Sequence, residues 1–315
     1  MSEPAIFARG LTRRFGSFTA VDAIDLDVAA GTIFGLLGAN GAGKSTTIRM
    51  LCGLLTSSDG TARVAGRDIN SEPEAVKQRI GYMSQEFSLY RDLTVAENIR
   101  FFGGIYGLRG SRLVERTRWA VEMAGLAGRE NALTATLSGG WRQRLALGCA
   151  ILHEPPVLFL DEPTGGVDPV SRRQFWNLIN DLAEQGITIL VTTHYLDEAE
   201  YCNNVSLMHA GRIVAAGTPA SLKRDQIPFP VWQVGTPEVT RAAETLGGNP
   251  EVLETAIFGQ TIHVVCKQKD DLGIAVITGA LETAGVPFSS VTRTEPSLED
   301  VFIHVIEAHS TGDFV

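Results

Sequence analysis

The chain has 315 residues, of which 44% are hydrophobic and 20% are charged, and its formal net charge is −9. This composition is typical of a folded globular protein and excludes a largely disordered one. The length allows one large domain and a small one, and the negative charge argues against nucleic acid as a partner.

No segment of the sequence has the character of a leader peptide or a membrane span. The N-terminal stretch lacks the uninterrupted apolar core of a signal peptide, and the strongest apolar runs, 157–160 and 187–191, are far too short to cross a bilayer. We therefore expect any work at a membrane to require a partner. The cysteines lie far apart without metal-binding spacing, which predicts buried, reduced thiols at Cys52, Cys149, Cys202 and Cys266.

The first elements predicted along the chain are strands that lead into a glycine-rich segment. Residues 21–28 alternate apolar and polar side chains, which predicts a half-buried strand. The apolar run 32–38 predicts a buried strand that enters the segment GANGAGKST, and a helix follows at 46–55. A strand pair within 60–69 and a short helix at 74–80 come next.

Strands and helices then alternate in a pattern that predicts an α/β sheet. A mostly helical block is expected over 92–153. The buried strands 156–161 and 187–194 are separated by the amphipathic segment 171–186, an alternation that is typical of a largely parallel sheet. Residues 206–217 predict a hairpin that turns at an Ala-Gly pair.

The sequence changes character near residue 222, where two prolines and a cluster of charges predict a linker. We expect a main domain over 1–222, a linker over 223–230 and a small α+β accessory domain over 231–315, in which we recognise no chemical motif. The elements expected in the accessory domain are a strand at 231–234, a helix near 237–246, strands within 252–266 and helices at 271–284 and 296–308.

GANGAGKST matches the phosphate-loop pattern G-x-x-x-x-G-K-[ST]. Gly41 and Gly43 let backbone N–H groups wrap phosphate oxygens, the lysine reaches the β and γ phosphates, and the following serine can ligate Mg²⁺. Because the loop follows a strand and opens a helix, the motif predicts nucleotide binding. The residues predicted to contact the nucleotide are Gly38, Asn40, Gly41, Ala42, Gly43, Lys44, Ser45 and Thr46.

PVLFLDEP supplies the complementary acidic residues. Its apolar run delivers Asp161 to the C-terminal end of a buried strand, where open α/β sheets place their ligands, and there the carboxylate can hold the Mg²⁺ water shell. Glu162 follows directly and can act as general base on an attacking water. Alone, two such acids are more often solvated loop residues, and the phosphate loop is what favours the functional interpretation.

LSGG at 137–140 stands between these two motifs, and the three together resemble the nucleotide-binding subunit of ATP-binding cassette (ABC) transporters over about residues 5–220. The resemblance implies an α/β P-loop cassette with a mixed sheet core, a helical subdomain at about 87–153 and a small C-terminal α+β domain. It also implies ATP and Mg²⁺ as cofactors.

Further family positions fall in order along the chain. Phe15 matches the aromatic that stacks on adenine, Gln85 the glutamine that joins Mg²⁺ to the helical subdomain, and His194 the histidine at the γ-phosphate. Each alone has a plainer interpretation: Phe15 could be a core residue, Gln85 an exposed loop residue and His194 a structural histidine. The resemblance implies catalytic roles for Glu162, His194, Gln85 and Lys44, metal ligation by Ser45, Gln85 and Asp161, and nucleotide contact by Phe15, Ser138, Gly139, Gly140 and Asp168.

The sequence departs from the family pattern at two places. Trp141 occupies the fifth signature position, where glutamine is usual, and Gly165-Gly166 begins the interface loop, where Ser or Asn with Gly or Ala is more common. The resemblance implies that Ser138 and the glycine N–H groups of LSGG contact the phosphate. Trp141 therefore need not abolish this contact.

The resemblance implies an ATPase motor that closes as a head-to-tail dimer around two ATP molecules. It further implies a separate membrane permease, docking through residues 87–108, a place on the cytoplasmic face of the inner membrane, and export of a drug, ion or lipid. The aromatic residues within 87–108 could equally belong to the core of the helical subdomain. The chain carries one cassette, so it must pair with itself or with another ATPase. An importer ATPase, or a cassette acting on DNA or ribosomes, are the alternatives.

Overall fold

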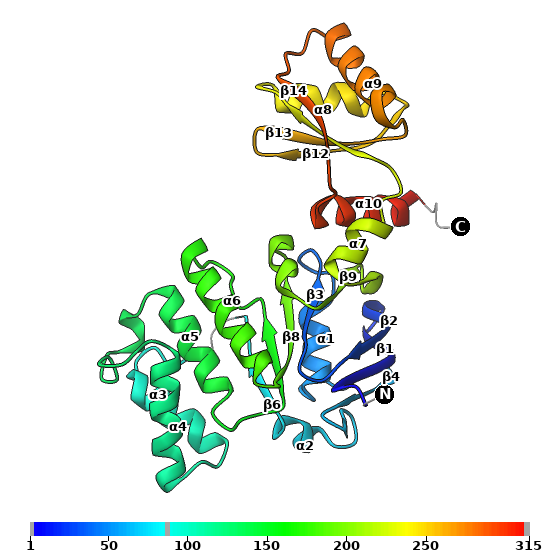
Figure 1. Cartoon of the computed structure of the whole chain (residues 1–315). Coiled ribbons are helices and arrows are strands. Elements are labelled where there is room, and N and C mark those ends of the chain that lie inside the picture. Colours follow the sequence, from blue (N-terminus) through cyan, green and yellow to red (C-terminus); the bar gives the residue numbers. More distant parts are fainter. Residues whose placement is uncertain (1–2, 86–88, 312–315) are drawn as a thin grey trace. The chain divides into compact units, whose positions relative to one another are not determined.

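The computed structural model describes residues 3–85 and 89–311, and the chain divides into two compact units, Met1–Ala216 and Gly217–Val315 (Figure 1). This division lies a few residues before the predicted boundary at 222. Helix α7 (Pro219–Asp225) covers the first residues of the segment that we expected to be a linker.

Two sheets build the first unit. The smaller, antiparallel sheet has the strand order β2-β1-β4-β5, and the larger has the order β10-β9-β3-β8-β7-β6. The strands of the smaller sheet are β1 (Ile6–Phe15), β2 (Phe18–Val28), β4 (Asp59–Val64) and β5 (Arg67–Asp68). Those of the larger sheet are β3 (Ile33–Leu37), β6 (Ile80–Met83), β7 (Val157–Asp161), β8 (Thr188–Thr193), β9 (Asn204–His209) and β10 (Arg212–Gly217).

The larger sheet is mainly parallel, as the alternating pattern predicts. Strands β9, β3, β8, β7 and β6 pair in parallel, and β9 and β10 form the predicted hairpin. In register, Leu37 of β3 pairs with Thr193 of β8, and Asp161 of β7 pairs with Thr192. The carboxyl ends of β3, β7 and β8 therefore meet at one edge, which is where such sheets bind ligands. Helix α1 (Lys44–Leu51) begins at this edge.

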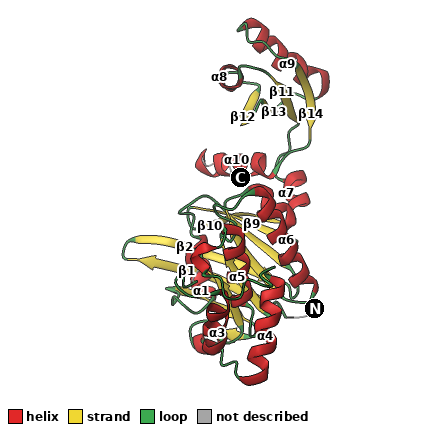
Figure 2. Cartoon of the chain, turned by 90° about the vertical axis from the view of Figure 1, so that its left-hand side faces the viewer, coloured by secondary structure: helices red, strands yellow, loops and turns green. Residues whose placement is uncertain are grey.

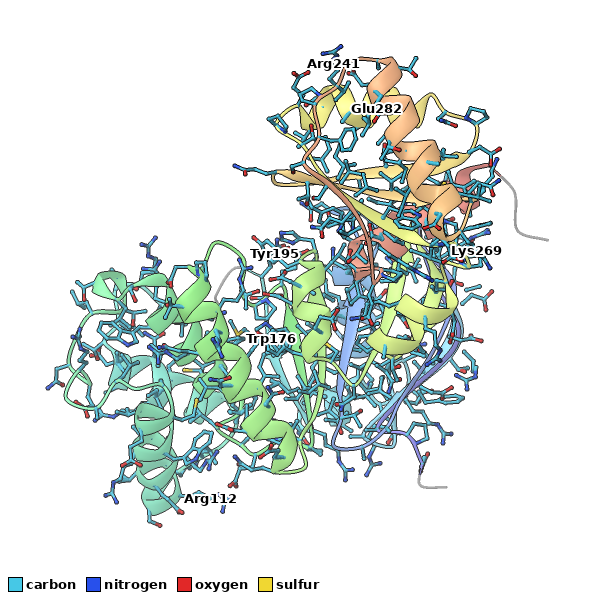
Figure 3. The ribbon with its side chains drawn as sticks, turned by 45° about the horizontal axis from the view of Figure 1, so that its top comes forward. Arg112, Trp176, Tyr195, Arg241, Lys269 and Glu282 are labelled. Carbon is cyan, nitrogen blue, oxygen red and sulfur yellow. The ribbon has the colours of Figure 1, made fainter. Side chains whose placement is uncertain are left out.

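The predicted helical block is confirmed over its described residues. It contains α3 (Val95–Ile105), α4 (Gly110–Met123) and α5 (Gly139–Ala150), which form a group at one side of the larger sheet (Figures 1 and 2). Helix α6 (Pro169–Glu184) buries an apolar face that includes Phe175 and Trp176 (Figure 3). Residues 87 and 88, with which the expected subdomain begins, lie outside the described residues.

Two strands of the first unit, β1 and β6, differ from the expectations, and each has a local cause. Strand β1 was not predicted because register shifts between Ala8 and Arg14 break its alternation. Residues 74–80 are only partly helical, since α2 (Pro73–Lys77) ends early and Ile80 already belongs to β6. Gly81 permits that strand, because a Cβ there would lie 2.5 Å from the carbonyl oxygen of Ala150.

Helix α1 is also shorter than the predicted 46–55. It starts two residues earlier, directly from the glycine loop, and ends at Leu51, with Cys52 as its C-cap. Gly53 then adopts the left-handed conformation with φ 66°, and the N–H of Leu54 donates to the carbonyl of Arg49, a closing pattern typical of glycine-terminated helices.

As far as residue 311, the second unit is a four-stranded antiparallel sheet of order β12-β13-β11-β14 with the helices α7, α8, α9 and α10. One face, with Trp232 and Val264, shares a core with α8 and α9. On β12 and β13, Glu254 contacts His304 of α10 at 2.5 Å, and His263 contacts Asp300 at 2.9 Å. The elements are β11 (Val231–Gly235), α8 (Val239–Gly247), β12 (Val252–Phe258), β13 (Thr261–Cys266), α9 (Asp270–Thr283), β14 (Ser290–Thr294) and α10 (Leu298–Thr311).

Two further sequence expectations can be compared with the structure. The four cysteines are buried and free, as predicted. Within the described part of the chain, no helix combines the length and the apolar character that crossing a bilayer requires.

Candidate functional site

A loop of bare backbone joins β3 to α1 at the carboxyl edge of the larger sheet. Gly41 and Gly43 have φ angles of 82° and 110°, which side chains with a Cβ rarely adopt. A Cβ on Gly38 would lie 2.2 Å from the carbonyl oxygen of Met208, and one on Gly43 would lie 2.5 Å from that of Ala20. Gly41 is therefore required by conformation, Gly38 by space and Gly43 by both, and the loop leaves N–H groups at a helix N-terminus that can bind an anion.

Lys44 is the first residue of α1, and its side chain is 3% exposed. Its ammonium donates to the carbonyl oxygens of Gly38 at 2.8 Å and Ala39 at 3.1 Å, and it lies 3.1 Å from Oε1 of Glu162. The loop therefore folds around its own lysine, which places a buried positive charge where phosphates would bind.

Asp161 and Glu162 occupy the end of β7. The Oδ1 atom of Asp161 accepts a hydrogen bond from the Ser45 hydroxyl at 3.0 Å, which joins the acidic strand end to α1. Oε2 of Glu162 accepts from Nε2 of Gln85 at 3.0 Å and lies 3.2 Å from Nδ1 of His194. Lys44, Gln85 and His194, which come from three different segments, therefore contact one carboxylate.

An open hollow of about 350 Å³ adjoins this group, and two loop glycines and several polar residues contribute to its wall. Phe18 lines it and is 63% exposed, whereas Phe15 does not. The ring of Phe15 instead lies 4.5 Å from the guanidinium of Arg13. Phe15 pairs with Phe18 across the β1–β2 turn, so the aromatic repeated after the turn was the signal that could have identified Phe18. The lining residues are Phe18, Ala20, Asn40, Gly41, Gly43, Lys44, Ser45, Thr46, Gln85 and Glu162.

The oxygen donors beside the hollow suit a hard divalent cation. Ser45 offers a hydroxyl, Asp161 a carboxylate and Gln85 an amide oxygen, which are the ligand types that Mg²⁺ prefers. Within residues 3–85 and 89–311, no group of three or more His, Cys, Asp and Glu is arranged to hold a metal. A hydroxyl, a carboxylate and an amide oxygen fit an ion that takes its other ligands from water and a bound ligand.

The LSGG segment does not line this hollow. Ser138 caps α5 by accepting a hydrogen bond from the N–H of Trp141 at 3.4 Å. A Cβ on Gly140 would lie 2.6 Å from the hydroxyl oxygen of Ser171 on α6, whereas one on Gly139 would meet no atom within 4 Å. The half-buried ring of Trp141 lies under the guanidinium of Arg129, 3.9 Å from its carbon to the ring centroid.

The interface loop predicted around Asp168 leads from the acidic strand end to α6. Asp168 caps that helix by accepting from the N–H of Ser171 at 2.9 Å. Hydrogen bonds from the hydroxyl and the backbone of Ser171 hold the pKa of Asp168 below its usual range. Gly166 has a φ of 69°, which accounts for a glycine at this position of the unusual Gly-Gly pair.

Sequence reasoning missed a buried polar network that links these loops. Glu198, fully buried, accepts from the hydroxyls of Thr164 and of Thr193, the latter at 2.7 Å. The Thr193 hydroxyl also accepts from the N–H of Tyr195, the residue after His194 at the end of β8 (Figure 3). No motif identifies Glu198, because one of its two partners, Thr164, lies 34 residues away in sequence.

Comparison with known proteins agrees with this geometry. Residues 21–165 match the family described as ABC transporter. The chain is 49% identical over 235 residues to the probable multidrug ABC transporter ATP-binding protein YbhF of Escherichia coli (strain K12), covering 73% of the chain and 41% of that protein. The chain therefore spans about two fifths of the length of that relative.

Other relatives match over most of both chains. Daunorubicin/doxorubicin resistance ATP-binding protein DrrA of Streptomyces peucetius is 41% identical over 82% of this chain and 77% of its own length. Nod factor export ATP-binding protein I of Cupriavidus metallidurans (strain ATCC 43123 / DSM 2839 / NBRC 102507 / CH34) is 37% identical over 94% and 95%.

One solved structure, described as the ATP-binding subunit of an ABC transporter, superposes with a TM-score of 0.63 at 30% identity over 70% of this chain and 92% of its own length. The chain belongs to the family of ABC transporter ATP-binding subunits.

Proposed function

We propose that the chain hydrolyses ATP with Mg²⁺ at the edge where β3, β7 and β8 end. The observation that carries this proposal is the convergence of Lys44, Gln85 and His194 on the carboxylate of Glu162, within 3.0–3.2 Å. The glycine N–H groups bind the phosphates, and Lys44 adds a positive charge that the β and γ phosphates share.

Glu162 is the general base in this proposal. It accepts a proton from the attacking water while the new P–O bond forms and the bond to the ADP oxygen breaks. His194 and Gln85 hold the carboxylate in position and meet the γ-phosphate side of the site. Bound Mg²⁺ would supply positive charge at the phosphate oxygens, held by Ser45, Asp161 and Gln85.

The LSGG segment completes the site of a second protomer. Ser138 stands at the exposed N-terminus of α5, outside the hollow that contains Lys44. Such a helix start binds an anion favourably, so a head-to-tail dimer would place it against the γ-phosphate held by its partner. Asp168 begins α6 beside it and belongs to the same interface. The partner is a second copy or a related ATPase.

An exposed apolar patch, formed by Tyr90 before α3 and by Phe101 and Ile105 of α3, supports docking to a membrane permease. Tyr90, Phe101 and Ile105 are 46%, 41% and 62% exposed, and the Tyr90 and Phe101 rings meet edge to face at 4.7 Å. Buried Asn98 bonds both backbone groups of Tyr90 at 2.9 Å and so fixes the patch on the helix. Such clustered exposed aromatics are typical of interaction surfaces.

We infer that the transported substance moves outward, because the similar proteins named above include a Nod factor export subunit and two proteins named for drugs. The chain then works on the cytoplasmic face of the membrane that holds the permease. Purification from solubilised membranes tests this assembly. A multi-span membrane protein should accompany the intact chain and be lost with Phe101→Glu, and preparations of the intact chain without one would contradict it.

Replacing the proposed base tests the chemistry. Glu162→Gln should lower phosphate release by at least about 100-fold, since general base catalysis contributes about that factor. ATP-dependent dimerisation should persist in size-exclusion chromatography because the amide keeps the shape of the site. Glu184→Gln, an exposed change on α6, is the control and should hydrolyse normally. Undiminished phosphate release by Glu162→Gln would remove Glu162 from this role.

A further inference from the structure

Thr192 lies inside β8, in register with Asp161 of β7, and it is fully buried. Its hydroxyl donates to Oδ1 of Asp161 at 2.7 Å and accepts from the backbone N–H of Glu162 at 3.0 Å. One hydroxyl therefore contacts both consecutive acids, once through a carboxylate and once through the backbone.

The bond to Asp161 fixes how that carboxylate is rotated. Its Oδ1 atom also accepts from the Ser45 hydroxyl at 3.0 Å, so two donors from different elements bond the same oxygen. Ser45 belongs to α1, which a bound nucleotide contacts, whereas Thr192 belongs to the sheet. Thr192 is thus the donor that holds the Asp161 rotamer from the rigid side of the site.

The bond to Glu162 acts on an unusual backbone conformation. Glu162 has a φ of 47°, in the left-handed region that residues with a Cβ rarely adopt and that persists only where neighbours fix it. Its N–H is shared between the hydroxyl of Thr192 at 3.0 Å and the carbonyl of the same residue at 3.1 Å. These two hydrogen bonds fix the backbone of Glu162 and so set the direction in which its side chain leaves the strand.

We propose that Thr192 is a positioning residue for hydrolysis, whose single hydroxyl orients the Asp161 carboxylate and the backbone of Glu162 together. The inference rests on the proposed roles of those two acids. A threonine in a buried strand is often present for its shape alone, and valine has that shape. The proposal therefore requires the hydroxyl itself, which a valine lacks and a serine keeps.

The experiment compares Thr192→Val and Thr192→Ser with a control on the same strand. Thr188 is equally buried, and its hydroxyl accepts from the N–H of Gly31 at 3.0 Å, away from the acids. Thr188→Val therefore removes a buried hydroxyl without touching Asp161 or Glu162. All three variants and the original chain are assayed for phosphate release against Mg²⁺ concentration, and for binding of a fluorescent ATP analogue with Mg²⁺ and with chelator.

Thr192→Val should lower kcat about tenfold and raise the Mg²⁺ concentration for half-maximal turnover several-fold, the scale of one lost hydrogen bond to a charged group. The gain in nucleotide affinity that Mg²⁺ brings should shrink in parallel, while binding with chelator stays unchanged. Thr192→Ser should restore both quantities to within about threefold. Thr188→Val should leave both as they are.

Equal losses in Thr192→Val and Thr188→Val, or a Thr192→Val chain with unchanged kcat and Mg²⁺ dependence, would overturn the inference. Glu162→Gln distinguishes failure of the proposed function from failure of the inference about Thr192. Full activity of Glu162→Gln would refute the proposed function rather than the role of Thr192. If Thr192→Val does not fold, Thr192→Cys replaces it. Its thiol is a weaker donor, so it must shift the Mg²⁺ dependence in the same direction to sustain the inference.

Discussion

The two glycine turns that open helices in the first unit look alike in sequence and differ in structure. In the phosphate loop, Gly41 and Gly43 need positive φ angles, and the Lys44 side chain folds back onto loop carbonyls and Glu162. In the LSGG turn, Gly139 has open space around its Cβ position, and Ser138 caps its own helix. The polar groups of the first turn therefore bind other groups of the same chain, whereas the second turn is exposed at Ser138 and open at Gly139.

The difference shows that glycine serves two purposes at such turns. In the phosphate loop it permits positive φ angles that residues with a Cβ rarely adopt, and the resulting turn presents backbone N–H groups that can bind an anion. At Gly140 it permits close packing, since a Cβ would meet the Ser171 side chain of α6 at 2.6 Å. The LSGG turn is therefore positioned by α6, whose first turn Asp168 caps.

The largest expected contrast comes from removing one polar side chain from each turn. Lys44→Ala should weaken ATP binding by a single chain by about 100-fold, since it deletes charge-assisted contacts to the phosphates. Ser138→Ala should leave that affinity unchanged and lower only turnover, because it acts on the partner's site. Equilibrium titration with dilute protein measures the first effect and phosphate release the second. Equal affinity losses in both variants would end the distinction between the two turns.

Adding a methyl group to each turn gives a contrast in stability. Gly43→Ala should lower the free energy of unfolding by at least about 2 kcal/mol, because its φ of 110° and the Ala20 carbonyl oxygen at 2.5 Å both oppose a Cβ. Gly139→Ala should change it by less than about 1 kcal/mol, in the stabilising direction, since alanine favours the helix. Urea denaturation of both variants checks this, and a Gly139→Ala chain as unstable as Gly43→Ala would contradict it.

The sequence predicted the elements whose patterns are local. Buried strands such as 156–161, the long helices and the hairpin at 206–217 follow from periodicity, and the structure contains them. Strand β1 was not predicted because bulges disturb its alternation, and β6 was not predicted because it is defined by its pairing with β7. Strand β14, with mostly exposed residues, has no apolar pattern and is defined by its partner β11.

The site followed the same rule. Lys44, Asp161 and Glu162 could be predicted because they lie in short, contiguous sequence motifs that indicate their chemistry. Thr192 and Glu198 could not, since their hydrogen-bond partners Asp161 and Thr164 lie 31 and 34 residues away in sequence. Threonine in a strand and glutamate in a short helix are also ordinary residues. Phe18 differs from Phe15 only by which side of a tight turn it occupies, and that choice depends on the surrounding fold.

The smallest expected effect concerns Trp141, the residue by which the LSGG turn departs from its family. Its indole is half-buried under the guanidinium of Arg129 at 3.9 Å, an arrangement worth about 0.5–1 kcal/mol at an exposed site. Trp141→Gln should therefore reduce the free energy of unfolding by no more than about 1 kcal/mol, and it should preserve or raise turnover, because Ser138 and the glycine N–H groups remain in place. Arg129→Gln should cost the same amount, and the two losses should not add in the double variant. A loss above about 3 kcal/mol from Trp141→Gln alone would instead make the indole a core residue, which would tie the outward-facing turn to the interior of its own chain.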